Sequence, residues 1–254
     1  MPDLKNILFL DIETAPMTAT LSELDPALAH LWEEKVEQMR RRVPERYTDD
    51  CTAESMYHEA GIFAEFGRVV CISVGFAYEE EGALLFREKS FYGEDERQLL
   101  LDFADLLNHS YQTPSHYLCG HNAKEFDFPF IARRMLIHGI QLPEILNVAG
   151  RKPWEVRLLD TMDMWKFGDY KHYTSLKLLC AVLGIPTPKD DIDGSQVAGV
   201  FYEERDLKRI AVYCEKDVLA TARAYLRMRG EGRELRIKRG PFGSMSALKG
   251  HHII

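Results

Sequence analysis

Two acidic residues, Asp11 and Glu13, stand at the end of a short apolar run in the sequence Phe-Leu-Asp-Ile-Glu-Thr. The run over residues 6–12 is short and apolar, as expected for a buried strand. Side chains two residues apart in a strand face the same way, so both carboxylates project from one face. Burying two acids together is costly unless a cation compensates their charge. The pair indicates a cation site, although acidic residues also occur at strand ends without a function.

Two further acids follow later in the chain. Asp127 lies at the junction of a predicted strand and a predicted helix, where it could equally cap the helix N-terminus. Tyr213 and Asp217 are four residues apart on a predicted helix and therefore share one face, although Tyr213 could equally belong to the core. Together the four acids offer the oxygen ligands that Mg²⁺ or Mn²⁺ prefers. Two such cations can clamp an in-line phosphoryl displacement.

The segments that must position these side chains alternate between strand-like and helix-like patterns. Apolar runs and helical periodicity predict strands over 6–12, 68–78, 83–92, 116–120 and 156–159, and helices over 95–107, 128–138, 174–183 and 206–229. Three consecutive antiparallel strands followed by alternating helices and strands predict an α/β fold. Its centre is a mixed β-sheet flanked by helices.

Residues 17–65 do not fit this alternation and are interpreted as a helical insertion between the first and second strands. The insertion contains a predicted helix from Ser22 to Arg42, with Ser22 and Asp25 as candidate N-caps. Because it leaves the end of the first strand, it would lie over whatever chemistry that strand carries. The alternative is that it only covers an edge of the sheet.

The 254 residues are predicted to form a single domain with a basic C-terminal tail at 230–254. The formal net charge of −8 argues weakly against a nucleic-acid-binding protein, but the stretch 205–239 is locally basic. That stretch is either a solvated surface or one that follows a phosphate backbone. No apolar stretch approaches the roughly 20 residues of a membrane span, so no membrane partner is expected. The five cysteines lack CxxC spacing and are typical of reduced thiols in a cytoplasmic protein.

The acidic motifs resemble, in order, the three exonuclease motifs of the DEDD superfamily. They read Phe-Leu-Asp-Ile-Glu-Thr, then Gly120-His-Asn122 followed by Phe126-Asp127-Phe-Pro129, then Tyr213-Cys-Glu-Lys-Asp217. The chain is most similar to stand-alone relatives of the proofreading exonuclease domain of family B DNA polymerases, over roughly residues 6–229. A tyrosine four residues before the last aspartate resembles the tyrosine subclass. The histidine subclass has a histidine five residues before it, where this chain has Val212.

The resemblance implies a ribonuclease-H-like fold, two divalent cations (Mg²⁺ or Mn²⁺) and stepwise release of mononucleotides from a 3′ end. The expected metal ligands are Asp11, Glu13, Asp127 and Asp217. The Tyr213 hydroxyl would orient the attacking water, because its ordinary pKa near ~10 suits an orienting group better than a base. The expected substrate contacts are the backbone of Thr14, the side chain of Asn122, and Phe126, which could instead be plain core packing.

Single-stranded DNA 3′ ends are the expected substrate, with RNA as the alternative, and a repair or replication protein is a possible partner. Two other classes of protein remain open. A haloacid-dehalogenase-type phosphatase also begins with an acidic strand end, but its chemistry needs a second aspartate where this chain has Glu13. A nucleic-acid-binding module that has lost catalysis would usually lack one of the acids, and none is missing.

Overall fold

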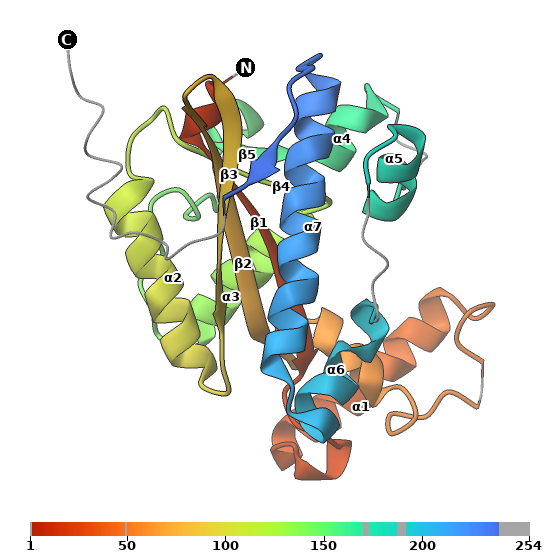
Figure 1. The fold of residues 1–254 in the computed structure, drawn as a ribbon. Coiled ribbons are helices and arrows are strands. Elements are labelled where there is room, and N and C mark those ends of the chain that lie inside the picture. The colour runs from red at the N-terminus through yellow and green to blue at the C-terminus, as the bar shows by residue number, and fades with distance from the viewer. Residues whose placement is uncertain (1, 49, 170–172, 187–191, 239–254) are drawn as a thin grey trace.

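Within the described residues, a six-stranded mixed sheet forms the centre of the molecule in the order β5-β4-β1-β2-β3-β6 (Figure 1). The structure is a computed structural model and describes residues 2–48, 50–169, 173–186 and 192–238. The strands are β1 (Ile7–Pro16), β2 (Gly67–Glu80), β3 (Ala83–Tyr92), β4 (Tyr117–Gly120), β5 (Leu158–Asp160) and β6 (Arg236–Ile237). Strands β1, β2 and β3 are antiparallel, and β4 and β5 run parallel to β1. The predicted α/β fold with a mixed sheet is confirmed.

Helices cover both faces of this sheet (Figure 1). They are α1 (Pro26–Arg42), α2 (Glu96–Ser110), α3 (Asp127–Ile137), α4 (Thr161–Lys166), α5 (Leu176–Val182), α6 (Val197–Gly199) and α7 (Leu207–Met228). The apolar run of β1 supplies side chains to both faces because successive residues alternate. Leu8 and Leu10 pack in the core under α2 and α3, whereas Ile7 and Phe9 pack under α7. A strand that is buried on both faces has no polar alternation, which explains the continuous apolar run in the sequence.

The β2–β3 hairpin closes through Glu81 and Gly82, whose φ angles are 52° and 79°. Positive φ at both residues is what a two-residue turn of type I′ requires, and glycine adopts it without steric cost. The hairpin predicted from the break at Glu79–Gly82 is therefore present, with β2 slightly longer than predicted and β3 as predicted. Its register is unbroken from Cys71↔Tyr92 to the turn.

The segment over residues 17–65 forms a small core of its own around Trp32, which is fully buried. Helix α1 begins at Pro26 and not at Ser22, because Asp25 is the N-cap and accepts hydrogen bonds from the first-turn N–H groups. The Trp32 indole N–H donates to the Ala53 carbonyl at 2.9 Å, which ties the helix to the rest of the segment.

This segment also packs against the end of β1 (Figure 1). The Met17 N–H donates to the Phe66 carbonyl at 2.8 Å. A Cβ at Gly61 would lie 3.0 Å from the Ala15 carbonyl carbon, so the close approach of the two backbones requires glycine there. The segment therefore lies just beyond Asp11 and Glu13 along the same strand.

The described part of the predicted tail adds β6 to the sheet, in parallel with β3. Its basic side chains pair with acidic ones near the β2–β3 turn. Arg233 contacts Glu79, and Lys238 contacts Glu80. In the described structure these cations therefore neutralise the acidic hairpin. The rest of the predicted tail, residues 239–254, lies outside the described residues.

A buried ion pair joins α2 to α3. Glu96 and Arg134 are 5% and 3% exposed, and two hydrogen bonds of 2.9 and 2.6 Å connect their side chains. Glu96 also accepts the Val69 N–H at 2.7 Å and lies 2.8 Å from a His138 ring nitrogen. Burial acts to raise the pKa of Glu96, but the Arg134 hydrogen bonds and charge outweigh it, so the pKa lies below its usual value.

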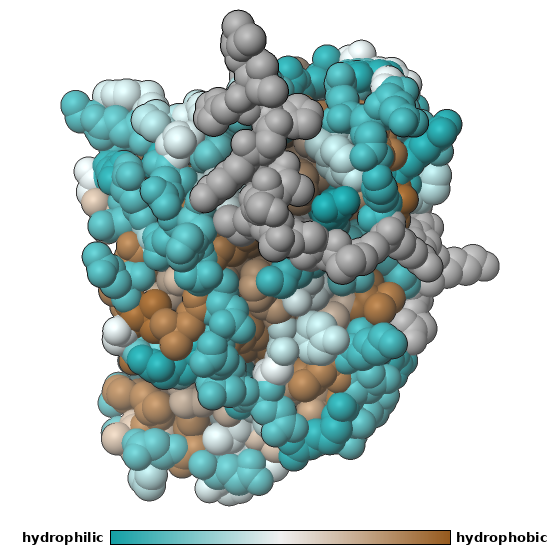
Figure 2. Space-filling model, turned by 60° about the vertical axis from the view of Figure 1, so that its left-hand side comes forward, coloured by the Kyte–Doolittle hydropathy of each residue, from teal (hydrophilic) through white to brown (hydrophobic). Residues whose placement is uncertain are grey.

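The molecular surface is mainly polar on the face shown in Figure 2, where apolar residues form separate groups in the lower half. Among the described helices, none combines the length and the apolar character that a membrane crossing would need.

Candidate active site

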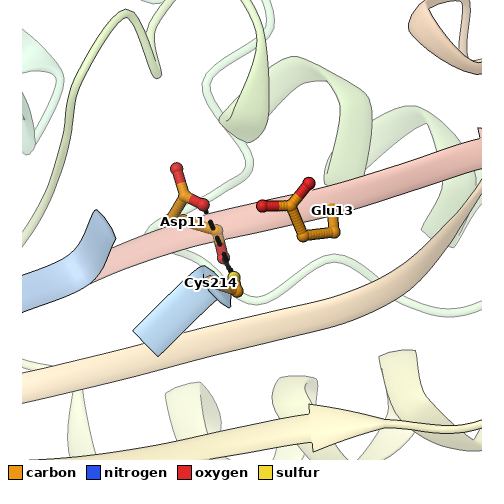
Figure 3. A group of neighbouring side chains, drawn as sticks. All are labelled: Asp11, Glu13 and Cys214. Atoms are coloured by element: carbon orange, nitrogen blue, oxygen red, sulfur yellow. Dashed lines mark hydrogen bonds between the residues drawn. The ribbon is translucent and has the colours of Figure 1, made fainter. Parts of the chain in front are cut away.

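Asp11 and Glu13 lie side by side on β1 and face α7 (Figure 3). They occupy the same face of the strand as Phe9, as the alternation in the sequence predicts. Glu13 is 7% exposed. The pairing of β1 with β2 shifts register just after Glu13, so that β2 carries one extra residue, Val70, at this point. Such a bulge changes the direction of nearby side chains and is common beside active sites.

Asp127, the first residue of α3, is attached directly to β1. Its Oδ1 accepts the Ile12 N–H at 3.1 Å in a buried hydrogen bond. Strand β4 pairs with β1 only as far as Phe9 and then ends at Gly120. The Asp127 carboxylate therefore satisfies a backbone N–H of β1 beyond the end of the neighbouring strand. This contact places it beside Asp11 and Glu13, and the N-cap position of α3 is occupied by Phe126 and not by Asp127.

The loop between β4 and α3 is held by Asp160, which ends β5 and is 2% exposed. The Asp160 carboxylate accepts the N–H groups of Asn122 (2.9 Å), Lys124 (3.0 Å) and Met162 (2.9 Å). Asn122 adopts a left-handed conformation with φ 60°. Its enclosed side-chain Oδ1 has no hydrogen-bond partner among the described residues. An enclosed acceptor without a partner is uncommon and is consistent with a contact that a substrate would complete.

Helix α7 brings the remaining residues to β1. Its buried face packs on the sheet, and Tyr213 and Asp217 are half-buried at the edge of that face. Cys214 is fully buried between them and β1. Its Sγ lies 3.3 Å from the Asp11 carbonyl oxygen and 3.5 Å from Asp11 Oδ2 (Figure 3).

The acids of this site affect one another electrostatically. Burial raises the pKa of Asp11 well above its usual value, and the charges of Asp127, Glu13 and Asp217 raise it further. Burial likewise raises the pKa of Glu13, with Cys71, Asp217 and Asp127 adding to the shift. Burial raises the pKa of Asp127 to about 7, in spite of its backbone hydrogen bonds. The structure therefore brings all four predicted acids within electrostatic reach of one another.

The donor set fits hard divalent cations. Asp11, Glu13 and Asp127 form no ion pair with any arginine or lysine among the residues that the structure describes. Several buried carboxylates without a cation are unfavourable as they stand, and oxygen ligands are what Mg²⁺ and Mn²⁺ prefer. Asp11, Glu13 and Cys214 each place one potential ligand atom within 4.8 Å of the others.

The predicted substrate residues lie at the borders of this cluster. Thr14 is half-buried and follows Glu13 at the bulge, and Asn122 lies in the loop that Asp160 holds. Phe126 is half-buried, packs against the α2–α3 core and has its ring 5.4 Å from that of Phe130. Core packing of Phe126 is thus observed, and its contact with a base stays a prediction.

Two residues near the site were not among the predicted site residues. Asp160 is the N-cap of α4, and it also fixes the loop that precedes Asp127. Cys214 entered the sequence analysis only as one of the five cysteines. Its position directly after Tyr213, on the sheet-facing side of the same helix, is the signal that could have identified its contact with Asp11.

Comparisons with known proteins give a match to a family model and similarity to individual proteins. Residues 62–238 match the model of a family described as predicted 3′–5′ exonucleases related to the exonuclease domain of PolB. An uncharacterized protein of Methanocaldococcus jannaschii is 26% identical over 147 residues, which cover 57% of this chain and 75% of that protein.

Proposed function

Because this chain belongs to the family of predicted 3′–5′ exonucleases related to the exonuclease domain of PolB, we propose that it removes mononucleotides from the 3′ end of single-stranded nucleic acid by two-metal-ion hydrolysis. The family carries the ribonuclease-H-like arrangement implied by the sequence resemblance, and the mixed sheet agrees with it. Membership also removes the phosphatase alternative. The observation that carries the proposal is the convergence of Asp11, Glu13, Asp127 and Asp217 at the end of β1.

The four carboxylates would hold the metal ions, with Asp11 central because all three other acids act on it. Bound at such a site, divalent cations lower the pKa of water and stabilise charge on the departing 3′ oxygen. The protein's own acids must lose their protons when the ions bind. The raised pKa of Asp127, about 7, means that it gives up a proton near neutral pH.

Tyr213 and Asp217 are one turn apart at the edge of the buried face of α7. With Asp217 as a metal ligand, the Tyr213 hydroxyl would orient the attacking water by a hydrogen bond. Asn122 and the backbone of Thr14 would then contact the terminal nucleotide. The hydrogen bond from the Asn122 N–H to the Asp160 carboxylate supports this arrangement, because it fixes the position of Asn122.

DNA is proposed as the preferred substrate because the motifs resemble those of polymerase proofreading domains. An exoribonuclease activity is the second candidate, since the chain has no identified residue that would distinguish a 2′-hydroxyl group. A repair or replication protein that supplies unpaired 3′ ends is the proposed class of partner.

The test is digestion of 5′-labelled single-stranded DNA, duplex DNA and single-stranded RNA in Mn²⁺, in Mg²⁺ and in chelator. We expect a ladder that shortens one nucleotide at a time, fastest on single-stranded DNA, and blocked by a 3′-phosphate. An Asp11→Ala/Asp217→Ala variant purified in parallel is the control for contaminating nucleases. Rapid cutting of a closed single-stranded circle would make the protein an endonuclease. Binding in metal without any ladder would leave only the catalytically silent module.

A further inference from the structure

Cys214 lies against one of the acids to which the proposed exonuclease function assigns the metal ions, and its role rests on that function. The Cys214 side chain is fully buried, and its Sγ contacts both the backbone oxygen and the carboxylate of Asp11. An ionised carboxylate and a carbonyl oxygen can only accept hydrogen bonds. When Asp11 is ionised, the single thiol proton of Cys214 is therefore shared between these two acceptors. In Figure 3 both contacts run from Cys214 on α7 to Asp11 on β1.

The contact matters because of what surrounds Asp11. Three acids, Asp127, Glu13 and Asp217, repel its carboxylate when they are charged. Among the described residues, the Cys214 thiol is the side chain that donates a hydrogen bond to this carboxylate. Without that donor, repulsion would be free to rotate the Asp11 carboxylate away from its neighbours. A metal site needs the opposite, with its ligands held in place before the ion arrives.

A chain of hydrogen bonds runs beside Cys214, from α7 through β3 to β2. Ser90 Oγ donates to Glu215 Oε1 at 2.6 Å. Ser73 Oγ lies 2.8 Å from Ser90 Oγ, and Cys71 Sγ lies 3.6 Å from Ser73 Oγ. Since Ser90 gives its one hydroxyl proton to Glu215, Ser73 must donate to Ser90, and Cys71 must donate to Ser73.

This order of donors leaves the proton of Cys214 for Asp11. The Cys71 and Cys214 side chains are in contact, but the thiol proton of Cys71 is directed toward Ser73. Cys71 can then only accept from Cys214, and a charged carboxylate is the stronger acceptor of the two. The network therefore directs the Cys214 thiol toward Asp11.

We propose that Cys214 is a positioning residue of the exonuclease site, which holds the Asp11 carboxylate in the orientation that binds the metal ions. Hydrogen-bond partners behind metal ligands typically contribute 10–100-fold to metal affinity or activity. The competing role is that of a thiolate ligand, because Asp11, Glu13 and Cys214 place ligand atoms within 4.8 Å of one another. A thiolate would select soft cations such as Cd²⁺ or Zn²⁺ over Mn²⁺ and Mg²⁺.

The experiment compares Cys214→Ala with Cys214→Ser, which keeps a donor, and with Cys119→Ala as the matched control. Cys119 is a fully buried thiol in the same sheet, on β4. Binding of Mn²⁺ to each protein without substrate is measured from the electron paramagnetic resonance signal of free Mn²⁺. The Mn²⁺ concentration for half-maximal digestion of single-stranded DNA is measured separately. We expect Cys214→Ala to raise both by about tenfold or more, Cys214→Ser to recover most of the loss, and Cys119→Ala to resemble the wild type.

Two outcomes would overturn the proposal. Mn²⁺ binding by Cys214→Ala that equals binding by Cys119→Ala would show that the thiol does not position Asp11. Tight Cd²⁺ binding that is lost in both the Ala and Ser variants would make Cys214 a ligand. The proposed function fails separately, because a wild-type protein that binds Mn²⁺ but digests no nucleic acid still gives the binding comparison.

Discussion

Glu96 and Asp127 are both buried carboxylates, 5% and 4% exposed, yet their surroundings shift their pKa values in opposite directions. Glu96 has a buried arginine, a backbone N–H and a histidine around it, and its pKa lies below the usual value. Asp127 has four acids within electrostatic reach and one backbone partner on β1, and burial raises its pKa to about 7. The charge of the first carboxylate is balanced within the protein, whereas the second belongs to the acidic cluster that we propose binds metal ions.

A structural buried acid can be distinguished from a functional one by the partners that surround its carboxylate. A structural acid is paired with a cationic side chain of the same protein. Breaking that pair should lower the stability of the fold and leave the catalytic activity nearly unchanged. A functional cluster of acids has no cationic side chain paired with it. Removing one of its acids should lower the catalytic activity and leave the stability of the fold nearly unchanged. The predictions below test this contrast, in order of decreasing effect.

The largest effect is expected from Asp11→Asn or Asp217→Asn. Each removes a charged metal ligand, so digestion of single-stranded DNA should slow by ~10³-fold or more, about 4 kcal/mol of transition-state stabilisation. Unfolding by urea in chelator should show no loss of stability, because one like charge has been removed from the cluster. A variant that digests DNA at more than a tenth of the wild-type rate would contradict the assignment of that ligand.

Arg134→Met should have the reverse effect. It leaves the buried Glu96 without its cation, which typically costs about 3–5 kcal/mol. Urea unfolding measures the loss, and digestion at a temperature where the variant is folded should stay within about twofold of wild type. The Glu96→Gln/Arg134→Met double variant is the control and should lose less, because no charge is left unpaired. A loss under about 1 kcal/mol in the single variant would show that Glu96 is not dependent on Arg134.

Divalent cations should stabilise the wild type through the cluster. Ions that bind only the folded protein contribute about 2.7 kcal/mol at ~100 times their dissociation constant. For a chain of this size that is roughly 5–10 °C in melting temperature between Mn²⁺ and chelator. The Arg134→Met variant should keep this shift, and Asp11→Asn should lose most of it. Equal melting temperatures for the wild type in Mn²⁺ and in chelator would count against a metal site.

Tyr213→Phe separates the role of the tyrosine hydroxyl from that of the metal ligands. The ring and its packing remain while the hydroxyl is lost, so digestion should slow on the order of 10²-fold, the range of positioned proton-handling groups. The stabilisation by Mn²⁺ should be unchanged, because the four carboxylates are intact. Full activity in this variant would mean that the water is oriented by another group, although the metal ligands would stand.

The smallest effect is a difference in pH dependence. The pKa of Asp127 is about 7 in the folded protein and ~3.9 when unfolded. Its contribution to stability is therefore full below the unfolded pKa and is lost as pH rises toward 7. The pKa of Glu96 is lowered, so its contribution is present above its unfolded value and is lost as pH falls through the folded pKa.

In chelator, wild-type stability should therefore fall between pH 5 and pH 8 relative to Asp127→Asn, by about 1 kcal/mol or more. Asparagine keeps an oxygen that can accept the Ile12 N–H, so the backbone contact is preserved. Parallel stability curves for the two proteins over this range would show that Asp127 titrates normally.

Local patterns in the sequence were sufficient for most of the fold and for choosing the acids of the candidate site. The continuous apolar run before Asp11 predicted β1, because a strand that is buried on both faces is apolar at successive positions. The hairpin followed from the Glu-Gly break, and α7 from its long helical periodicity. The spacing of Asp11 and Glu13 was enough to place both carboxylates on one face.

Contacts between distant segments were not predictable in this way. The hydrogen bond from Ile12 to Asp127 joins residues 115 positions apart, and the Cys214 contact with Asp11 joins residues 203 apart. Neither leaves a local pattern, because each depends on how α3 and α7 pack on the sheet. Strand β6 has only two residues and depends on the exposed edge of β3, so its pairing was also missed.

The position of α7 in the chain has a consequence for how the protein is made. This helix covers the sheet face that carries Asp11 and Glu13, and it follows every other long helix and strand that the structure describes. While the ribosome is still adding earlier residues, that face has no cover and Asp217 does not yet exist. We therefore expect a nascent chain to acquire its folded core and its complete set of acids in the same late step. Shorter translation products would then lack the capacity to cut nucleic acid.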